Sequence, residues 1–322
     1  MTSEFDLIRE YFTKPTQHTV LSIGDDAALI SAAQGMELAI SADMLVAGTH
    51  FFHNADAYKL GWKSLAVNVS DMAAMGANPK WVTLAIALPH ADKYWLAEFS
   101  RGFFTCAKKF NIDLIGGDTT RGPLTISVQI MGEVPQGKAI KRSGAKAGDD
   151  IWVSGTLGDA ALALAHMQGK LHDKLPLDDG YIEYCLHALH APKPRVELGF
   201  NLRDIATSAI DISDGLLSDL GHILKASATG AKIQLNKLPT SAFISQHLHE
   251  KHIQEYVLAG GDDYELCFTA PTSAKEQING LSHQLNLALT NIGCITTIPV
   301  LHVYDESHQL TKYKTTGYDH FA

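Results

Sequence analysis

The sequence predicts a mixed α/β protein built from two domains. Segments with helical and strand-like hydrophobic patterns alternate along the chain, which is typical of a mixed fold. The chain has 322 residues, which corresponds to about two domains of ordinary size. With 46% hydrophobic and 19% charged residues, it has enough apolar side chains for a sizeable core. We expect an N-terminal domain over 1–148 and a C-terminal domain over 149–322, because the polar segment 141–150 is the clearest boundary.

The first half of the chain contains four apolar runs of strand character: 36–42, 81–88, 112–115 and 124–133. Three segments carry helix signals: 4–13, 55–75 and 95–110. The first of these helices would begin after Ser3, a favoured N-cap residue. The first strand is expected to stop at Asp43, and the third to end in Gly116-Gly117-Asp118. Polar residues would therefore follow buried strands.

The second half continues the alternation. Strands are expected over 151–154 and 209–213, and helices over 160–167 and 215–226. The charged stretch 168–194 is interrupted by prolines and is expected to contain a helix and a loop. No internal repeat with a period of about 20–50 residues is visible.

Composition argues against several classes of function. The formal net charge of −9 and the pI of about 5.9 disfavour a nucleic-acid-binding protein, which needs a basic face. No apolar run reaches the length of about 18 residues that a membrane span requires. The segment 1–6 carries two acids and no basic stretch, so it does not resemble a signal peptide. The four cysteines form no C-x-x-C pair and are expected to be reduced, mostly buried thiols of a cytoplasmic protein.

Aspartates recur at the edges of the apolar runs. Six of them follow expected strands or their turns: Asp25, Asp26, Asp43, Asp118, Asp211 and Asp214. Asp71 differs, because it lies in the last turns of the helix expected over 55–75, where its charge opposes the helix dipole. Carboxylates without histidine or cysteine suit hard cations, and Mg²⁺ is the usual ion where phosphates complete the shell. The alternative is that each aspartate merely caps a turn or a helix.

Three other segments have weaker signals. The glycines of 116–120 would let backbone N–H groups approach a phosphate, although the chain has neither a Walker A motif nor the protein-kinase motifs. Segment 141–144 is either a phosphate clamp or a solvated linker, and the turn 155–158 is a connection or a second phosphate loop. His247, His249 and His252 lack the H-E-x-x-H order and are expected to be surface residues of an exposed loop.

Eight motifs occur in a characteristic order: 24–28, 41–46 with 48–51, 68–76, 115–122, 141–145, 210–215, 260–266 and 317–321. Through them the chain resembles the thiamine-monophosphate kinases, within the aminoimidazole-ribonucleotide synthetase superfamily, along essentially its whole length. The resemblance implies an N-terminal α/β domain that dimerises through its sheet and a second α/β domain. It also implies ATP-dependent phosphorylation of thiamine monophosphate to thiamine diphosphate, with ATP and several Mg²⁺ ions held between the domains near the dimer interface.

The resemblance also implies roles for individual residues. The residues implied to hold metal are Asp26, Ser41, Ala42, Asp43, Asp71, Asp118, Asp211 and Asp214. Those implied to contact ATP are Gly117, Arg142 and Ser213, and those implied to contact thiamine monophosphate are His50, Asp262 and Tyr318. The chain departs from the family at two of these positions. Ala42 stands where threonine is usual, so only its carbonyl oxygen could bind metal, and Asp262 replaces the usual glutamate.

Direct in-line transfer suits this chemistry. A phosphate monoester is largely deprotonated near pH 7, so the acceptor needs no general base, and no phosphoenzyme is required. One alternative is another enzyme of the superfamily, either an aminoimidazole-ribonucleotide synthetase or a selenophosphate synthetase. The latter usually has a reactive cysteine near its N-terminus, whereas the first cysteine here is Cys106. A different class is a regulatory module that binds Ca²⁺ or a nucleotide without catalysis.

Overall fold

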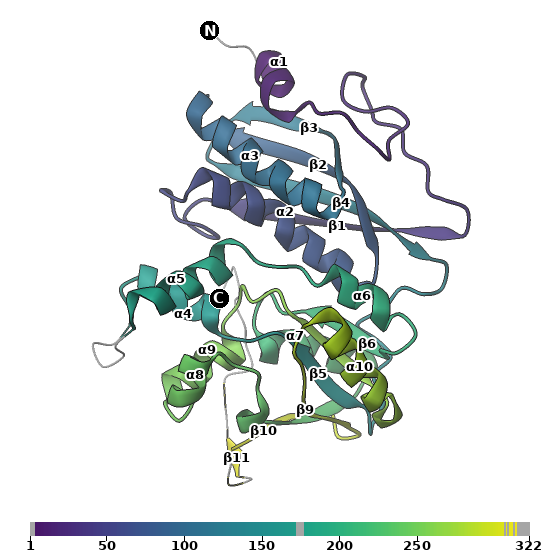
Figure 1. The fold of residues 1–322 in the computed structure, drawn as a ribbon, viewed down its shortest axis with the longest axis vertical. Helices are drawn as coiled ribbons and strands as arrows, with labels where there is room; N and C mark the ends of the chain where they lie inside the picture. The colour runs from purple at the N-terminus through teal and green to yellow at the C-terminus, as the bar shows by residue number, and fades with distance from the viewer. Residues whose placement is uncertain (1–3, 172–176, 306, 308, 312, 314–322) are drawn as a thin grey trace. The chain divides into compact units, whose positions relative to one another are not determined.

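The computed structural model describes residues 4–171, 177–305, 307, 309–311 and 313 (Figure 1). The chain divides into two compact units. The N-terminal unit comprises Met1–Met72 and Ala77–Gly137, and the C-terminal unit comprises Ala73–Gly76 and Lys138–Ala322. No helix in the described ranges is both long and apolar enough to cross a bilayer.

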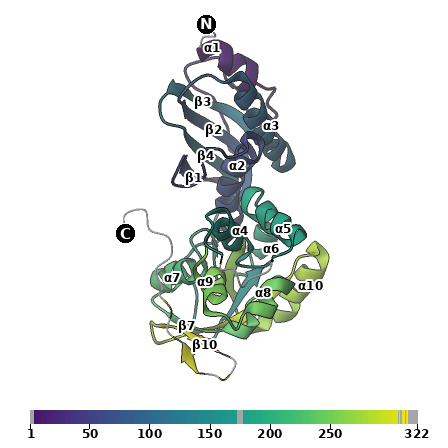
Figure 2. The ribbon, with the colours of Figure 1, turned by 90° about the vertical axis from the view of Figure 1, so that its left-hand side faces the viewer.

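The N-terminal unit is built on a four-stranded sheet with the order β1-β4-β2-β3. Its strands are β1 (Met36–Val46), β2 (Asn78–Leu88), β3 (Asp113–Arg121) and β4 (Thr125–Pro135). Only β2 and β3 pair in parallel, because the helix α3 (Lys93–Phe110) makes the crossover between them. Helix α2 (Ala57–Ala74) lies on the same face of the sheet as α3 (Figure 2). The short α1 (Glu4–Leu7) and the π-helical η1 (Ile8–Phe12) precede the sheet.

Two glycines let α2 and α3 touch backbone to backbone. A Cβ atom on Gly61 would lie 2.1 Å from the carbonyl oxygen of Phe99, and one on Gly102 would lie 1.9 Å from that of Tyr58. Both distances are far below van der Waals contact, so no side chain fits at either position. At the start of α3, Asp92 caps the helix by accepting two backbone N–H groups.

The segment before β1 is fastened to the sheet by two buried carboxylates. Asp113 accepts the backbone N–H groups of Gln17 and His18 at 2.9 and 2.6 Å. Glu133 accepts the N–H of Ala33 at 2.8 Å. A buried carboxylate needs hydrogen-bond donors, and here the backbone of this segment supplies them. The bonds therefore fix both ends of an irregular stretch.

The middle of that segment forms a small hairpin. Leu21 and Leu29 pair as an antiparallel bridge, and the exposed Asp25 and Asp26 lie at the tip between them. Further along the segment, apolar residues cover part of the sheet face that α2 and α3 leave open. The residues of this small core are Ala28, Ile30, Trp81, Ile115 and Met131.

The C-terminal unit contains a mixed sheet with the strand order β11-β10-β7-β9-β5-β8-β6 in the described residues. The strands are β5 (Asp150–Ser154), β6 (Ser208–Asp211), β7 (Gly230–Gln234), β8 (Leu266–Ala270), β9 (Leu289–Thr296), β10 (Leu301–Tyr304) and β11 (Leu310–Thr311). Five helices pack their apolar sides into one core with this sheet: α4 (Asp159–Met167), α5 (Asp179–His190), α7 (Leu216–Ser227), α8 (Ala242–His247) and α9 (Lys251–Ala259). Helices α6 (Val196–Leu202) and α10 (Lys275–Leu285) contact each other, and α10 also contacts β9. The 3₁₀ turns η2 (Leu235–Lys237) and η3 (Thr272–Ala274) complete the unit.

The α/β class and most of the expected elements are confirmed, but two strand ends were wrong. β1 continues past Asp43 to Val46, because it pairs with β4 along its whole length. β3 runs through Gly116-Gly117-Asp118 to Arg121, because β2 offers a partner up to Leu88. Neighbouring strands thus override local turn signals. The expected N-cap, Ser3, lies outside the described residues.

The expectation of an exposed loop around the histidine cluster was also wrong. His247 ends α8 and His252 lies within α9, and both are half-buried, while His249 is exposed. The ring of His247 stacks on Phe243 with a centroid separation of 4.4 Å, and its Nδ1 lies 2.9 Å from the carbonyl oxygen of that residue. Packing on a neighbouring turn explains His247 without a metal.

Candidate functional site

Predicted site residues meet where β1 passes the last turns of α2. The hydroxyl of Ser41 donates a hydrogen bond to Oδ2 of Asp71 at 2.5 Å. Two residues along β1, the backbone N–H of Asp43 donates to Oδ1 of Asn68 at 3.2 Å. Side chains two apart on a strand share a face, so Ser41 and Asp43 both lie on the helix side of the sheet. The structure therefore brings Ser41 into contact with Asp71 and places the side chain of Asp43 on the same side of the sheet.

Asn68 fixes this arrangement from within α2. It is 1% exposed, and its side-chain amide also donates to the carbonyl oxygen of Ser64 at 3.0 Å. Because the amide nitrogen is committed to the helix, the amide oxygen is turned toward β1. Asn68 was not predicted as a site residue, although it begins the motif 68–76.

Asp118 lies away from this group. Its strand, β3, and the strand of Asp43, β1, form opposite edges of the sheet with β4 and β2 between them. Three strand spacings amount to about 14 Å. Asp118 is in register with Ala85, which pairs with Ser127 and hence with Met44, so Asp118 lies on the open face with Ala42. One N-terminal unit does not bring Asp118 to Asp71.

Gly117 is required by strand packing. Its φ is +149°, and a Cβ atom there would lie 1.8 Å from the carbonyl oxygen of Leu84 on β2. A side chain is excluded for that reason alone, whatever the residue contacts in a complex. Its predicted contact with ATP stays a prediction.

His50 is oriented by the turn that follows β1. Its Nδ1 accepts the backbone N–H of Val46 at 3.0 Å. A neutral His50 therefore carries its proton on Nε2 and presents that nitrogen as a donor.

Asp26, by contrast, is exposed at the tip of the 21–29 hairpin.

In the C-terminal unit, the loop after β6 is organised by a carboxylate that sequence reasoning missed. Oδ2 of Asp219 accepts the backbone N–H groups of Ser213 and Asp214, each at 3.0 Å. Asp219 lies in the first turn of α7 and is 2% exposed. Burial raises the pKa of the Asp219 carboxyl to about 7. Asp211, at the end of β6, is also buried.

A second loop, 260–264, closes against the first. The N–H of Asp262 donates to the carbonyl oxygen of Ser213 at 2.9 Å, and that of Tyr264 donates to Ile212 at 2.8 Å. A Cβ atom on Gly261 would lie 2.4 Å from the Ser213 oxygen. Asp262 itself has a φ of +71°. The structure thus brings together Ser213 and Asp262, which were predicted to contact different substrates.

Two further carboxylates, those of Asp263 and Glu265, connect the second loop to neighbouring segments. Both carboxylate oxygens of the half-buried Asp263 lie within hydrogen-bond range of the N–H of Gly158, the N-cap of α4, at 3.0 and 3.2 Å. Desolvation raises the pKa of the Asp263 carboxyl well above its usual value, despite that hydrogen bond. Glu265 forms a two-point ion pair with Arg195, with Nε–Oε2 at 2.7 Å. Both residues belong to the motif 260–266, in which only Asp262 was predicted to contact a substrate.

The remaining predicted residues have different outcomes. Arg142 is exposed beside the beginning of β6, where the carbonyl oxygen of its neighbour Lys141 accepts the N–H of Ala209 at 3.1 Å. Asp211 and Asp214 follow the other end of that strand. Tyr318 lies outside the described residues. In the described part of the chain, no three carboxylate, imidazole or thiol side chains converge as a metal-binding group.

Comparison with known proteins identifies the family. Residues 24–134 match the family described as AIR synthase related protein, N-terminal domain. The thiamine-monophosphate kinase of Escherichia coli is 46% identical over 323 aligned positions, covering 99% of this chain and 98% of that protein. The chain belongs to the thiamine-monophosphate kinase family. The crystal structure of the thiamine-monophosphate kinase from Stenotrophomonas maltophilia is 47% identical, with a TM-score of 0.83 over 89% of this chain and 91% of that one.

A further thiamine-monophosphate kinase structure, AaThiL complexed with AMPPCP and TMP, is 30% identical with a TM-score of 0.75. The match covers 93% of this chain and 92% of that one. Both units of the present chain therefore have counterparts in this family. The likeness supports the α/β architecture predicted from the motifs.

The donor chemistry of the residues predicted to hold metal suits a hard cation. Ser41, Asp43 and Asp71 offer hydroxyl and carboxylate oxygens, and Asp211 and Asp214 offer carboxylates in the other unit. No nitrogen or sulfur ligand lies among them, which fits Mg²⁺ and disfavours zinc.

Proposed function

We propose that the protein transfers the γ-phosphoryl group of ATP to thiamine monophosphate and so produces thiamine diphosphate. The observation that carries this proposal is the 46% identity to the Escherichia coli thiamine-monophosphate kinase over nearly the whole of both chains. The relative AaThiL was crystallised with AMPPCP, an ATP analogue, and with TMP. ATP and thiamine monophosphate are accordingly the two substrates that we assign to this chain.

The main obstacle to this reaction is electrostatic. ATP carries about four negative charges near pH 7, and the acceptor phosphate carries nearly two. Mg²⁺ would offset this charge when bound, and the residues proposed to hold it are Asp26, Ser41, Ala42 through its carbonyl, Asp43, Asp71, Asp118, Asp211 and Asp214. The hydrogen bond from Ser41 keeps the Asp71 carboxylate turned toward β1. Arg142 adds a positive charge for the phosphates of ATP.

Two closed loops support substrate positioning. The Asp219 carboxylate holds the N–H groups of Ser213 and Asp214, so a side chain of the protein itself shapes the loop proposed to meet ATP. The bond from Asp262 to Ser213 couples this loop to the one proposed to meet thiamine monophosphate. With His50 and Tyr318 as further contacts, these groups would align the acceptor oxygen for in-line attack. The acceptor is already deprotonated, so the chain needs no general base.

We also propose that the protein is a homodimer that pairs through its N-terminal sheet. β1 is an edge strand, and its open face carries a period-two row of exposed apolar side chains. These are Met36, Leu38, Ile40 and Met44, with exposures of 38%, 40%, 58% and 56%. A second copy covering this row would remove both an exposed apolar stripe and an open strand edge. We place the protein in the cytoplasm, consistent with its four free thiols.

The direct test is a product assay. Purified protein is incubated with ATP, Mg²⁺ and thiamine monophosphate, and the thiamine esters and adenine nucleotides are separated. We expect thiamine diphosphate and ADP in equal amounts, with free thiamine a poor acceptor because it lacks an ionised acceptor oxygen. Phosphorylation of free thiamine at a comparable kcat/KM, or no ATP consumption with thiamine monophosphate, would overturn the proposal. Asp211→Asn serves as the matched low-activity control.

A further inference from the structure

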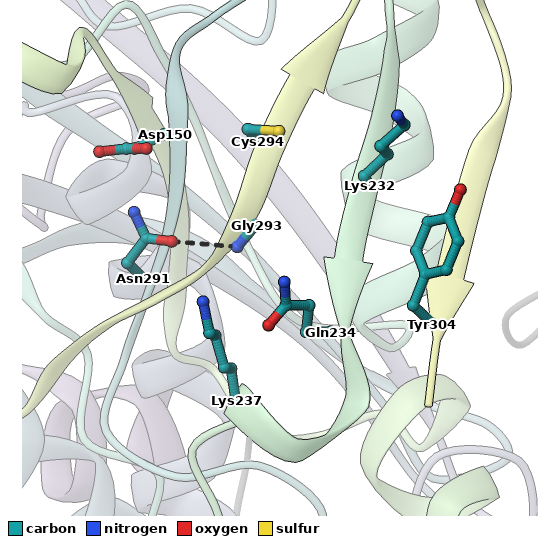
Figure 3. Close-up of a pocket in the computed structure, with 8 residues that line it drawn as sticks. All are labelled: Asp150, Lys232, Gln234, Lys237, Asn291, Gly293, Cys294 and Tyr304. Carbon is teal, nitrogen blue, oxygen red and sulfur yellow. Dashed lines mark hydrogen bonds between the residues drawn. The ribbon is translucent and has the colours of Figure 1, made fainter. Parts of the chain in front are cut away.

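The C-terminal sheet carries a cavity of about 470 Å³ that none of the proposed substrate or metal residues lines (Figure 3). Strand pairing explains why its lining residues meet. Lys232 on β7 is opposite Cys294 on β9, and Cys294 is opposite Asp150 on β5. On the other side of β7, Gln234 is opposite Tyr304 on β10. Residues opposite one another in register share a face of the sheet.

This face is the one turned away from the main core of the C-terminal unit. Along β7, Ala231 and Ile233 alternate with Lys232 and Gln234. Ala231 and Ile233 belong to the core that the five helices cover, so Lys232 and Gln234 lie on the opposite face. The cavity is therefore built into the second face of the sheet. Asn291 enters it where β9 bulges, since the register of β5 and β9 shifts between Ile151 and Trp152.

The lining of the cavity is rich in hydrogen-bond donors. Oδ1 of Asn291 accepts the N–H of Gly293 at 3.2 Å, so the amide nitrogen is turned away from the strand. Figure 3 shows the amine of Lys237 beside the amide of Gln234, whereas the amide nitrogen of Asn291 points toward Asp150. Lys232 and the phenol of Tyr304 stand at the other side of the cavity. Donors outnumber fixed acceptors in this cavity.

The two lysines of the cavity have no counter-ion among the residues that the structure describes. Lys232 and Lys237 are both exposed, and neither forms an ion pair or a side-chain hydrogen bond with any residue in the described ranges. Asp150 is the single acid among the lining residues, and two strand spacings, about 10 Å, separate it from Lys232. The cavity thus has an excess of positive charge in a chain whose net charge is −9.

We propose that this cavity binds a phosphorylated small molecule. A phosphate group accepts hydrogen bonds from lysine amines and from side-chain amides, and these are the donors that line the cavity. The volume is larger than an inorganic phosphate needs and lies in the range of small-molecule sites, about 300–1,000 Å³. The ring of Tyr304 offers a surface against which the rest of an aromatic ester stacks. The inference does not depend on the proposed kinase activity.

Cys294 provides a local reporter for the test. It lines the cavity and is partly exposed, whereas Cys106, Cys185 and Cys267 are buried. The rate of alkylation by iodoacetamide, an uncharged reagent, is measured with increasing inorganic phosphate or phenyl phosphate. Each is compared with KCl at equal ionic strength. We expect both phosphates to slow the alkylation and phenyl phosphate to act at a lower concentration. A Cys294→Ser variant should lose the reacting thiol.

Matched variants separate the cavity from other anion sites. In the double variant Lys232→Gln, Lys237→Gln, the concentration of phenyl phosphate that protects Cys294 should rise at least tenfold. A control double variant, Lys251→Gln, Lys275→Gln, removes two exposed lysines of the same unit outside the cavity and should keep the wild-type value. Turnover of thiamine monophosphate should be the same in all three proteins.

Three results would overturn the proposal. They are equal protection by KCl and by phosphate, unchanged protection in the Lys232, Lys237 double variant, and protection by benzoate at the same concentration as by phenyl phosphate. The last would show a preference for any aromatic anion rather than for a phosphate. Loss of kinase turnover has no bearing on these measurements, so failure of the proposed function and failure of this site are distinguishable.

Discussion

The buried carboxylate of Asp219 accepts the backbone N–H of Ser213 at 3.0 Å, and the same oxygen accepts the N–H of Asp214. A single side chain from α7 thereby sets the shape of the loop after β6. We expect Asp219→Ala to leave two buried donors unpaired and to lower the free energy of unfolding by about 1–3 kcal/mol. Asp219→Asn keeps one acceptor oxygen and should retain most of the stability.

The kinetic consequence distinguishes positioning from simple stabilisation. In Asp219→Ala, the KM for ATP should rise and kcat should fall even at a temperature where the variant is fully folded. Asp219→Asn should recover most of both. Measurement of kcat and KM for both variants, with circular dichroism to verify folding, tests this. Normal kinetics in folded Asp219→Ala would show that the loop keeps its shape without the carboxylate.

Asp71→Asn should separate metal binding from folding. Asparagine keeps an oxygen that can accept the hydrogen bond of Ser41, so the melting temperature in EDTA should stay within about 2 °C of wild type. It is a poorer Mg²⁺ ligand, so turnover should fall at least a hundredfold. Thermal melts in EDTA and in Mg²⁺-ATP, run beside turnover assays, provide the measurement. A markedly lower melting temperature with near-normal turnover per folded molecule would mean that Asp71 is structural.

Asp262 can be tested without disturbing its backbone. Its φ of +71° is tolerated by asparagine but strained for alanine, so Asp262→Asn is the cleaner variant. Loss of one charged contact should raise the KM for thiamine monophosphate by about 5- to 150-fold, equivalent to about 1–3 kcal/mol, with little change for ATP. An unchanged KM in Asp262→Asn would place recognition elsewhere.

The raised pKa of Asp263 predicts that the stability of the protein depends on pH. Its pKa is raised in the folded protein, so the folded state holds the proton more tightly than the unfolded chain. The stability that this group contributes is fully present below its unfolded pKa of about 3.9 and is lost as the pH rises toward its folded value. Asp263→Asn resembles the protonated form and should gain stability over wild type as the pH increases from 5 to 8. Urea unfolding of both proteins across this range measures the difference, which would be flat if Asp263 were ionised throughout.

The dimer proposal has a simple charge test. Ile40→Lys places a charge in the middle of the exposed apolar row on β1 and should convert a dimer to a monomer in light scattering at micromolar concentration. Tyr94→Lys alters an isolated side chain of α3 that is 79% exposed and should leave the dimer intact. A wild-type protein that is monomeric at all concentrations would contradict the proposal.

Local patterns were sufficient to predict the class of the fold and most of its elements. They failed at Asp43 and Asp118, where an aspartate suggested a turn and the strand continued because a neighbouring strand supplied hydrogen bonds. Pairing between distant segments is not encoded in a short window of sequence. For the same reason, the sequence could not show that Asp118 lies far from Asp71 in one unit, because strand order decides which carboxylates share an edge.

The site residues that the sequence did not reveal are those that position other residues. Asp219 and Asp263 act on backbone N–H groups, and no side-chain motif marks such a bond in advance. The only cues were general ones, an acid in the first turn of a helix for Asp219 and a pair of acids after two glycines for Asp263. Motif similarity found the positions proposed to touch ligands, such as Ser213 and Asp262. Physical contacts were needed to find what orders those positions.

The contact of α2 with α3 at Gly61 and Gly102 has a bearing on how mutational scans of this enzyme are interpreted. Asp71 lies ten residues beyond Gly61 on the same rigid helix, about 15 Å along its axis. A methyl group at Gly61 would force α2 and α3 apart, and the displaced α2 would disturb the contact of Asp71 with Ser41. A scan that scores activity alone would therefore mark Gly61 as a catalytic position, although its role is to let two helices pack.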